Sequence, residues 1–248
     1  MVIQKTMMLT MYMSTYMLYL RFMPTAETLG DVFVGVSFSV VLWSICSLFI
    51  QRITRTSRKT SSYMTSIVHA VTSVCLASSA LYINHPIDLV NYSSGLLILT
   101  MYNSIGYWIY DIFNLIEKTN HSVLLHHVCN ATVGIFVVYY KQTLGVFMIG
   151  LLTEISSVFV NARQLMKETH MQTSVLYRIN STFMLITFII TRLTIPSVLF
   201  LVILQNLEHL NGILPKFGGI ALTTLMTILN WYWFIIYTTG YFHKCNID

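Results

Sequence analysis

Apolar residues occupy the chain in long runs that short polar segments separate. Each run has about the 20 residues that an α-helix needs to cross the hydrocarbon core of a bilayer. The sixth run contains Pro196 and is expected to be broken there. The pattern predicts an all-α polytopic membrane protein, a bundle or ring of about seven transmembrane helices. The predicted spans cover residues 31–50, 61–83, 93–116, 123–140, 143–162, 179–204 and 217–242.

The first 30 residues follow this pattern less clearly. The apolar run MMLTMYMSTYMLYL has fourteen residues and lies between Lys5 and Arg21. Its length suits a signal-peptide core, a helix in the membrane interface or an additional span, and all three remain open. We divide the chain into an N-terminal segment (1–30), a transmembrane domain (31–243) and a short tail (244–248).

Composition supports the membrane class. Hydrophobic residues make up 55% of the chain and charged residues 9%, and the mean hydropathy is +0.68. A soluble domain carries about 25% charged residues, so the soluble class is excluded. The four cysteines form no CxxC pair, and we expect packing roles rather than disulfides for them. The net charge of +5 comes from residues at the ends of the apolar runs, so we expect no nucleic-acid partner.

The basic residues also predict an orientation. If the loop QRITRTSRKT lies in the cytosol, nine basic residues fall on that side and four on the other. The positive-inside rule then predicts a cytosolic C-terminus and an N-terminus outside or in the lumen. The cytosolic set is Arg52, Arg55, Arg58, Lys59, Lys118, Arg163, Lys167, Arg178 and Lys244. The opposite set is Lys5, Arg21, Lys141 and Lys216, while Arg192 lies within a span.

Five titratable residues lie at similar depth within four of the predicted spans. Counted from the cytosolic ends at about 1.5 Å per residue, these side chains lie roughly 6–13 Å below the membrane surface. Acidic and histidine side chains are costly in hydrocarbon and normally face the bundle interior. The five residues are His69, Asp111, His126, His127 and Glu154.

Helical spacing adds further polar residues to the same faces. We predict a polar cavity in the cytosolic half, although helix-packing contacts alone could also explain these stripes. Arg192, about 20 Å deep, is expected to line the far end of the cavity or to pair separately. The four stripes are Ser62–Ser66–His69–Ser73, Ser104–Tyr107–Asp111–Asn114, His126–Asn130 and Glu154–Ser157–Asn161.

The paired histidines carry the candidate chemistry. Neighbouring residues of a helix point about 100° apart, so His126 and His127 are not expected to share a metal ion. Histidine beside a carboxylate suits general-base or acyl-carrying chemistry. We therefore assign catalytic roles to His126, His127, Asp111 and Glu154. Substrate-binding roles are assigned to His69, Tyr107, Asn130, Ser157, Asn161 and Arg192, and the aromatic residues Trp231, Tyr232, Trp233 and Tyr241 are expected to be core and interfacial anchors.

Several of these segments together resemble the TLC domain family, which includes the ceramide synthases and small multi-pass proteins of lipid homeostasis. The chain is most similar to the small TLC-domain proteins and more distantly to the ceramide synthases. Ceramide synthases share the HH pair but carry an HD-x-x-D pattern where this chain reads LLTEISS. The matching segments, in family order between residues 51 and 242, are SIVHAV, GYWIYDI, LLHHVCN, LLTEISSVFVNAR, INSTFMLITFIITRL and LNWYWFIIYTTGYF.

The resemblance implies a ring of helices around a lipid-accepting cavity. The first function it suggests is binding of an acyl-chain or sphingolipid-type lipid, in the endoplasmic reticulum or, as the alternative, in the plasma membrane. The second is a ceramide-synthase-like N-acyltransferase that uses acyl-CoA as co-substrate and no resident cofactor or metal. The third is a chaperone or cargo receptor for other membrane proteins. The expected partners are therefore membrane lipids and, in the third case, membrane proteins.

Overall fold

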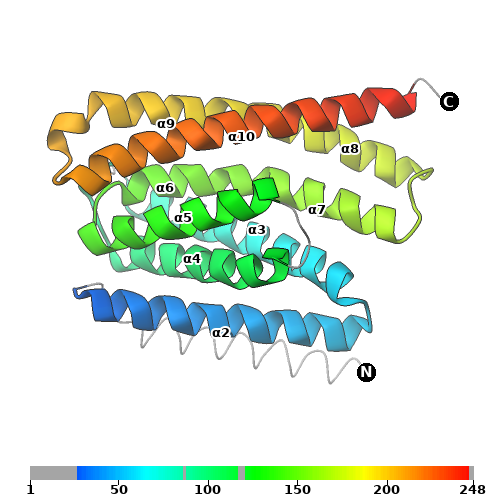
Figure 1. The fold of residues 1–248 in the computed structure, drawn as a ribbon, viewed down its shortest axis with the longest axis horizontal. Helices are drawn as coiled ribbons and strands as arrows, with labels where there is room; N and C mark the ends of the chain where they lie inside the picture. Colours follow the sequence, from blue (N-terminus) through cyan, green and yellow to red (C-terminus); the bar gives the residue numbers. More distant parts are fainter. Residues whose placement is uncertain (1–26, 86–87, 117–120, 246–248) are drawn as a thin grey trace.

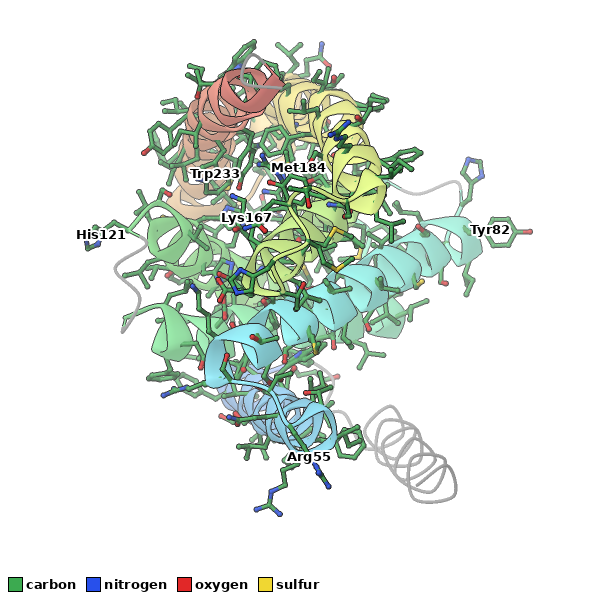
Figure 2. The ribbon with its side chains drawn as sticks, turned by 90° about the vertical axis from the view of Figure 1, so that its right-hand side faces the viewer. Arg55, Tyr82, His121, Lys167, Met184 and Trp233 are labelled. Carbon is green, nitrogen blue, oxygen red and sulfur yellow. The ribbon has the colours of Figure 1, made fainter. Side chains whose placement is uncertain are left out.

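The computed structural model of the protein describes residues 27–85, 88–116 and 121–245. The predictions for residues 1–26 and for the last three residues lie outside this range. The described long elements are α-helices, most of which run with their axes roughly aligned, while α3 crosses the others obliquely (Figure 1 and Figure 2). They are α2 (Leu29–Thr54), α3 (Arg58–Ile83), α4 (Gly95–Ile116), α5 (His121–Tyr140), α6 (Leu144–Leu151), α7 (Ile155–Glu168), α8 (Val175–Thr187), α9 (Thr194–Gln205) and α10 (Ile213–Cys245).

Each of the seven predicted runs is helical. Short irregular turns join two pairs of helices into longer units: the 3-10 turn η1 (Leu152–Glu154) joins α6 to α7, and the π-helical turn η2 (Phe188–Leu193) joins α8 to α9. Of the described helices, six units have the length and hydropathy of membrane spans, namely α2, α3, α5, α6–α7, α8–α9 and α10. The remaining long helix, α4, has 22 residues and is buried among its neighbours. The chain is an all-α, multi-pass membrane protein.

Six of the seven units form a closed ring, and α2 lies outside it. Around the ring α3 packs on α4, α4 on α5, α5 on α10, α10 on α9, and the α6–α7 unit on both α8 and α3. Figure 2 looks along most of the helices, with α3 running obliquely across the view, and shows α7, which carries Lys167, near the middle, α8 and α10 on one side of it and α2 at the opposite edge. The predicted bundle or ring of about seven helices is confirmed: six units close the ring, and the seventh, α2, packs on its outside.

Small residues explain how closely α2 packs on α4. A Cβ atom at Gly106 would lie 2.3 Å from the Ser39 hydroxyl oxygen, and one at Gly35 would lie 2.6 Å from the ring of Tyr102. Such small residues let transmembrane helices approach closely and gain van der Waals contact. The indole N–H of Trp43 also donates a hydrogen bond of 2.9 Å to the carbonyl oxygen of Asn103. This contact fixes α2 against the ring.

Two ends of the molecule can be distinguished. The end with Arg55, Lys59 and Lys167 is called the basic end, and the end with Asp88 and Gln142 is called the far end. At the far end, the backbone N–H groups of Asn91 and Val90 hydrogen-bond Asp88 and hold the pKa of its carboxyl below the ordinary value. This cluster orders the loop that leads into α4.

The two irregular turns contact each other inside the ring. Proline at position 196 explains the second one, since it has no N–H to donate to the carbonyl of Arg192 four residues earlier. The first turn contains Thr153 and is followed by Ser156, whose hydroxyls bond the carbonyls of Gly150 and Thr153. Side chains that bond nearby carbonyls compete with regular helix. Both breaks therefore occur where α6–α7 and α8–α9 face the centre.

Candidate functional site

The ring encloses two cavities of different character. The polar cavity, near the basic end, has a volume of about 450 Å³ and is lined from all six units of the ring. The apolar cavity, toward the far end, has a volume of about 190 Å³ and is lined mainly by α5, α6, α9 and α10. The two cavities share four lining residues, which we call the boundary. The boundary residues are Trp108, His126, Glu154 and Arg192.

The polar cavity brings together nine of the ten predicted site residues. They come from α3, α4, α5, η1, α7 and η2, so the convergence expected from the polar stripes is present. Asn130 is the exception, because it lines the apolar cavity. The residues in the polar cavity are His69, Tyr107, Asp111, His126, His127, Glu154, Ser157, Asn161 and Arg192. Their catalytic and binding roles stay predictions.

His127 and Asp111 form a buried pair. Nδ1 of His127 lies 3.4 Å from a carboxylate oxygen of Asp111, and both residues are buried. Among the described residues Nδ1 has no hydrogen-bond partner of good geometry, so this contact is close but not yet a hydrogen bond. In ligand-free enzymes such contacts are often long and tighten when substrate binds. The pair has the arrangement of a base and the carboxylate that orients it.

His126 points to a different environment. Its Nδ1 lies 3.0 Å from the sulfur of Met226, and the side-chain nitrogen of Asn130 donates to the carbonyl of His126 at 3.0 Å. The two imidazole rings are 5.4 Å apart and inclined at 50°. The adjacent histidines therefore diverge, with His127 toward Asp111 and His126 at the boundary.

His69 is held rigidly in the wall of the polar cavity. Its ring stacks on Tyr107 with centroids 3.7 Å apart, and the edge of Trp43 packs against both rings. Its Nε2 is 2.9 Å from the hydroxyl of Ser73, and the hydroxyls of Tyr107 and Ser66 are 2.6 Å apart. These contacts satisfy His69 as a helix-packing residue while leaving it on the cavity surface.

Arg192 and Glu154 meet at the boundary. Their side chains approach to 3.7 Å, and Arg192 also donates hydrogen bonds to Ser156 at 2.7 Å and Ser157 at 2.6 Å. The sequence placed Arg192 deeper than Glu154, but the structure puts them at one level. Helix α7 continues to Glu168, fourteen residues beyond Glu154, or about 21 Å instead of the predicted 13 Å. Helix α7 therefore extends beyond the predicted end of its span at residue 162, and the depth of Glu154 in the membrane stays a prediction.

The sequence interpretation also missed several lining residues. Trp233 was expected to be a core or interfacial anchor and is buried, but it also lines the polar cavity and packs against the ring of His126 with centroids 5.4 Å apart. Trp231 and Tyr232 are exposed on the outside of α10, as expected of anchors. At the mouth, Lys59 pairs with Glu168 at 2.7 Å. The spacing of Lys59 and Tyr63, one turn before Ser66, could have revealed this extension of the polar stripe.

The donor set does not suggest a metal centre. Within the described residues no group of three histidine, cysteine or acidic side chains lies close enough to hold an ion. The walls of the polar cavity carry imidazole, carboxylate, guanidinium and aromatic groups.

Comparison with known proteins agrees with this architecture. The sequence pattern of the TLC domain matches residues 59–238, which begins in α3 and so covers the ring without α2. TLC domain-containing protein 2 of Danio rerio is 31% identical over 188 residues, 72% of this chain and 76% of the relative. TLC domain-containing protein 1 of Mus musculus is 28% identical over 105 residues, 41% of this chain and 42% of the relative. The chain belongs to the TLC domain family.

Proposed function

We propose that this protein binds the acyl chain of a membrane lipid inside the ring. The chain would occupy the apolar cavity, and the polar part of the lipid would occupy the polar cavity. The observation that carries the proposal is that the polar and apolar cavities adjoin, because they share the lining residues Trp108, His126, Glu154 and Arg192. A ligand that is apolar at one end and polar at the other matches this pair of spaces.

The length of the apolar cavity supports an acyl chain as the ligand. Its lining runs along α6 from Thr143 to Glu154, about 16 Å at the helical rise. One leaflet contributes half of a hydrocarbon core of about 30 Å, so a membrane acyl chain is about 15 Å long. The walls are largely apolar, with side chains such as Phe136, Leu199 and Leu222. The length of the lining therefore matches the length of one acyl chain between the boundary and the far end.

The positive-inside pattern supports an orientation with the basic end and the C-terminus in the cytosol. In that orientation the polar cavity receives its ligand from the cytosolic side, and the apolar cavity extends toward the lumenal leaflet. The endoplasmic reticulum is the membrane we propose, on the resemblance to lipid-homeostasis proteins.

Purification and lipid analysis test the proposal directly. The protein is extracted in mild detergent, and retained lipids are identified by mass spectrometry beside two glycine variants. Gly150→Leu would fill the apolar cavity one turn from the boundary, where the nearest atom to an added Cβ is 3.8 Å away. Gly95→Leu makes the same change on exposed surface of α4 and is the matched control. We expect retained acyl lipid in the wild type and Gly95→Leu and a strong loss in Gly150→Leu.

Equal lipid content in all three proteins would contradict the proposal. A stable protein partner together with cavities that retain no lipid would instead favour a receptor or chaperone function.

A second candidate function, acyl transfer, is favoured by the Asp111–His127 pair. A neutral His127 oriented by Asp111 could accept a proton from an acceptor hydroxyl or amine, while the carbonyl of an acyl thioester lies near the boundary. The acceptor oxygen or nitrogen would form the new bond to the acyl carbon. The thiolate would leave and take up the proton from His127. Consumption of acyl-CoA by the purified protein with a lipid acceptor tests this function.

A further inference from the structure

Arg192 is built into the boundary as a fixed donor with one free edge. Its guanidinium carbon lies 5.8 Å from the ring centres of both Phe188 and Trp233, which hold the charged group between them. Nε and Nη2 donate to Ser156 and Ser157 on α7. No described residue accepts a hydrogen bond from Nη1. Nη1 carries two of the five N–H donors of a guanidinium.

The backbone around Arg192 departs from regular α-helix. Arg192 lies within the π-helical turn η2, four residues before Pro196. A π-helical turn adds a residue to the helix and re-aims the side chains near it, and such turns are frequent at functional sites. The side chain is 8% exposed and lines both cavities. The free edge therefore faces ligand space and not the membrane.

The charges around Arg192 indicate which group this edge would receive. Glu154 already lies 3.7 Å from the guanidinium, and Asp111 is a second carboxylate on the same cavity. An anionic ligand group would bring a third negative charge next to one arginine. Like charges in a poorly solvated site are strongly unfavourable. A neutral acceptor avoids this repulsion and still uses the N–H donors.

We propose that Nη1 of Arg192 binds the carbonyl oxygen of a fatty acyl ester, thioester or amide. This assignment rests on the proposed acyl-chain function and adds the chemical class of the bound group. The carbonyl is the point at which an acyl chain joins its polar part, and Arg192 lies where the apolar and polar cavities meet. The residue therefore sets the register of the lipid and selects esterified or amidated chains over free fatty acids.

Three probes of equal chain length test the assignment. They are a monoacylglycerol, the monoalkylglycerol ether that lacks the carbonyl oxygen, and the free fatty acid. Binding of each to delipidated protein is measured by displacement of a fluorescent acyl lipid. A hydrogen bond from a charged donor contributes about 1.5–3 kcal/mol. We therefore expect the wild type to bind the ester about 10-fold or more tightly than the ether, and to bind the fatty acid more weakly than the ester.

The variant is the double substitution Glu154→Gln and Arg192→Gln, which removes both charges and leaves neither buried alone. It should bind ester and ether equally, at about the wild-type affinity for the ether. Arg192→Lys keeps the charge but loses the planar set of donors, so it should show a reduced preference for the ester over the ether. This variant replaces the double variant if the latter fails to fold. Gly95→Leu should keep the full preference.

Equal binding of ester and ether by the wild type would overturn the assignment while leaving acyl-chain binding intact. A preference that survives the double substitution would overturn it as well. Failure of all three probes to bind the wild type would instead contradict the proposed function, and the assignment with it.

Discussion

Filling the far part of the apolar cavity should shorten the acyl chains that the protein accepts. Gly218 lines this cavity in α10, and an added Cβ there meets no atom within 4 Å. It lies eight residues from Met226, which contacts His126 at the boundary, so it is about 12 Å from the boundary along the helix. A leucine at this position would occupy space that the end of a long chain needs.

The size of the effect follows from the volume of the new side chain. Leucine adds four carbon atoms at Gly218, so a long chain would lose the burial of about four methylene groups, each contributing about 0.8 kcal/mol. The loss of about 3 kcal/mol corresponds to a decrease in affinity of roughly 150-fold. Chains shorter by about four carbons would end before the leucine and bind as before. Gly150→Leu, by contrast, lies about 6 Å from the boundary and should exclude all long chains.

The assay offers delipidated protein an equimolar mixture of acyl lipids that differ only in chain length. Retained lipids are then quantified by mass spectrometry for the wild type, Gly218→Leu and the surface control Gly95→Leu. We expect the distribution to move to shorter chains in Gly218→Leu alone. An unchanged distribution in a folded Gly218→Leu protein would refute the proposed direction of the chain, because the far end would then be empty in the complex.

Three further predictions follow from other parts of the molecule. If acyl transfer occurs, His127→Ala should lower turnover by about 10²–10⁴-fold, as expected for loss of a general base. Asp111→Asn should also lower turnover, without abolishing lipid retention. Full turnover in His127→Ala would exclude His127 as the base. Arg192→Gln alone should destabilise the protein by about 3–5 kcal/mol by leaving buried Glu154 unpaired, whereas adding Glu154→Gln should restore much of the loss in a detergent thermal melt. Asp88→Asn should lower thermal stability near neutral pH. Folding lowers the pKa of Asp88 below its usual 3.8, so the contribution of Asp88 to stability is present above that value and disappears as the pH falls through the folded pKa. The difference between the melting temperatures of the wild type and Asp88→Asn should therefore vanish in acid.

The helices could be predicted because a long apolar run inside a bilayer satisfies its own backbone hydrogen bonds by forming an α-helix. Their arrangement was less accessible. The run that forms α2 is as apolar as that of α8–α9, and nothing in its pattern indicates that it lies outside the ring. The contacts that place it there involve Gly35 and Ser39, small residues that any packed helix can contain. Packing between helices, not the hydropathy of one helix, decides this feature.

The site was predictable where side chains follow regular helical spacing. His69, Asp111 and Asn161 lie on stripes that do face one cavity. Asn130 follows the same rule on α5, yet it faces the other cavity, since the space inside the ring changes character one turn beyond His126. The meeting of Arg192 and Glu154 could not be counted from residue numbers. It depends on two irregular turns and on a helix α7 that extends beyond the predicted end of its span.

The external position of α2 has a mechanical consequence for the whole protein. Because α2 is fastened along α3 and α4 by interlocked small residues and by the indole of Trp43, one side of the ring is reinforced against expansion. The opposite side, made by α9 and α10, has no comparable contact with α2, and the exposed Thr132 of α5 lies on the rim of the apolar cavity. The layer that α2 adds therefore covers only one side of the ring, and the side made by α9 and α10 forms its own outer surface.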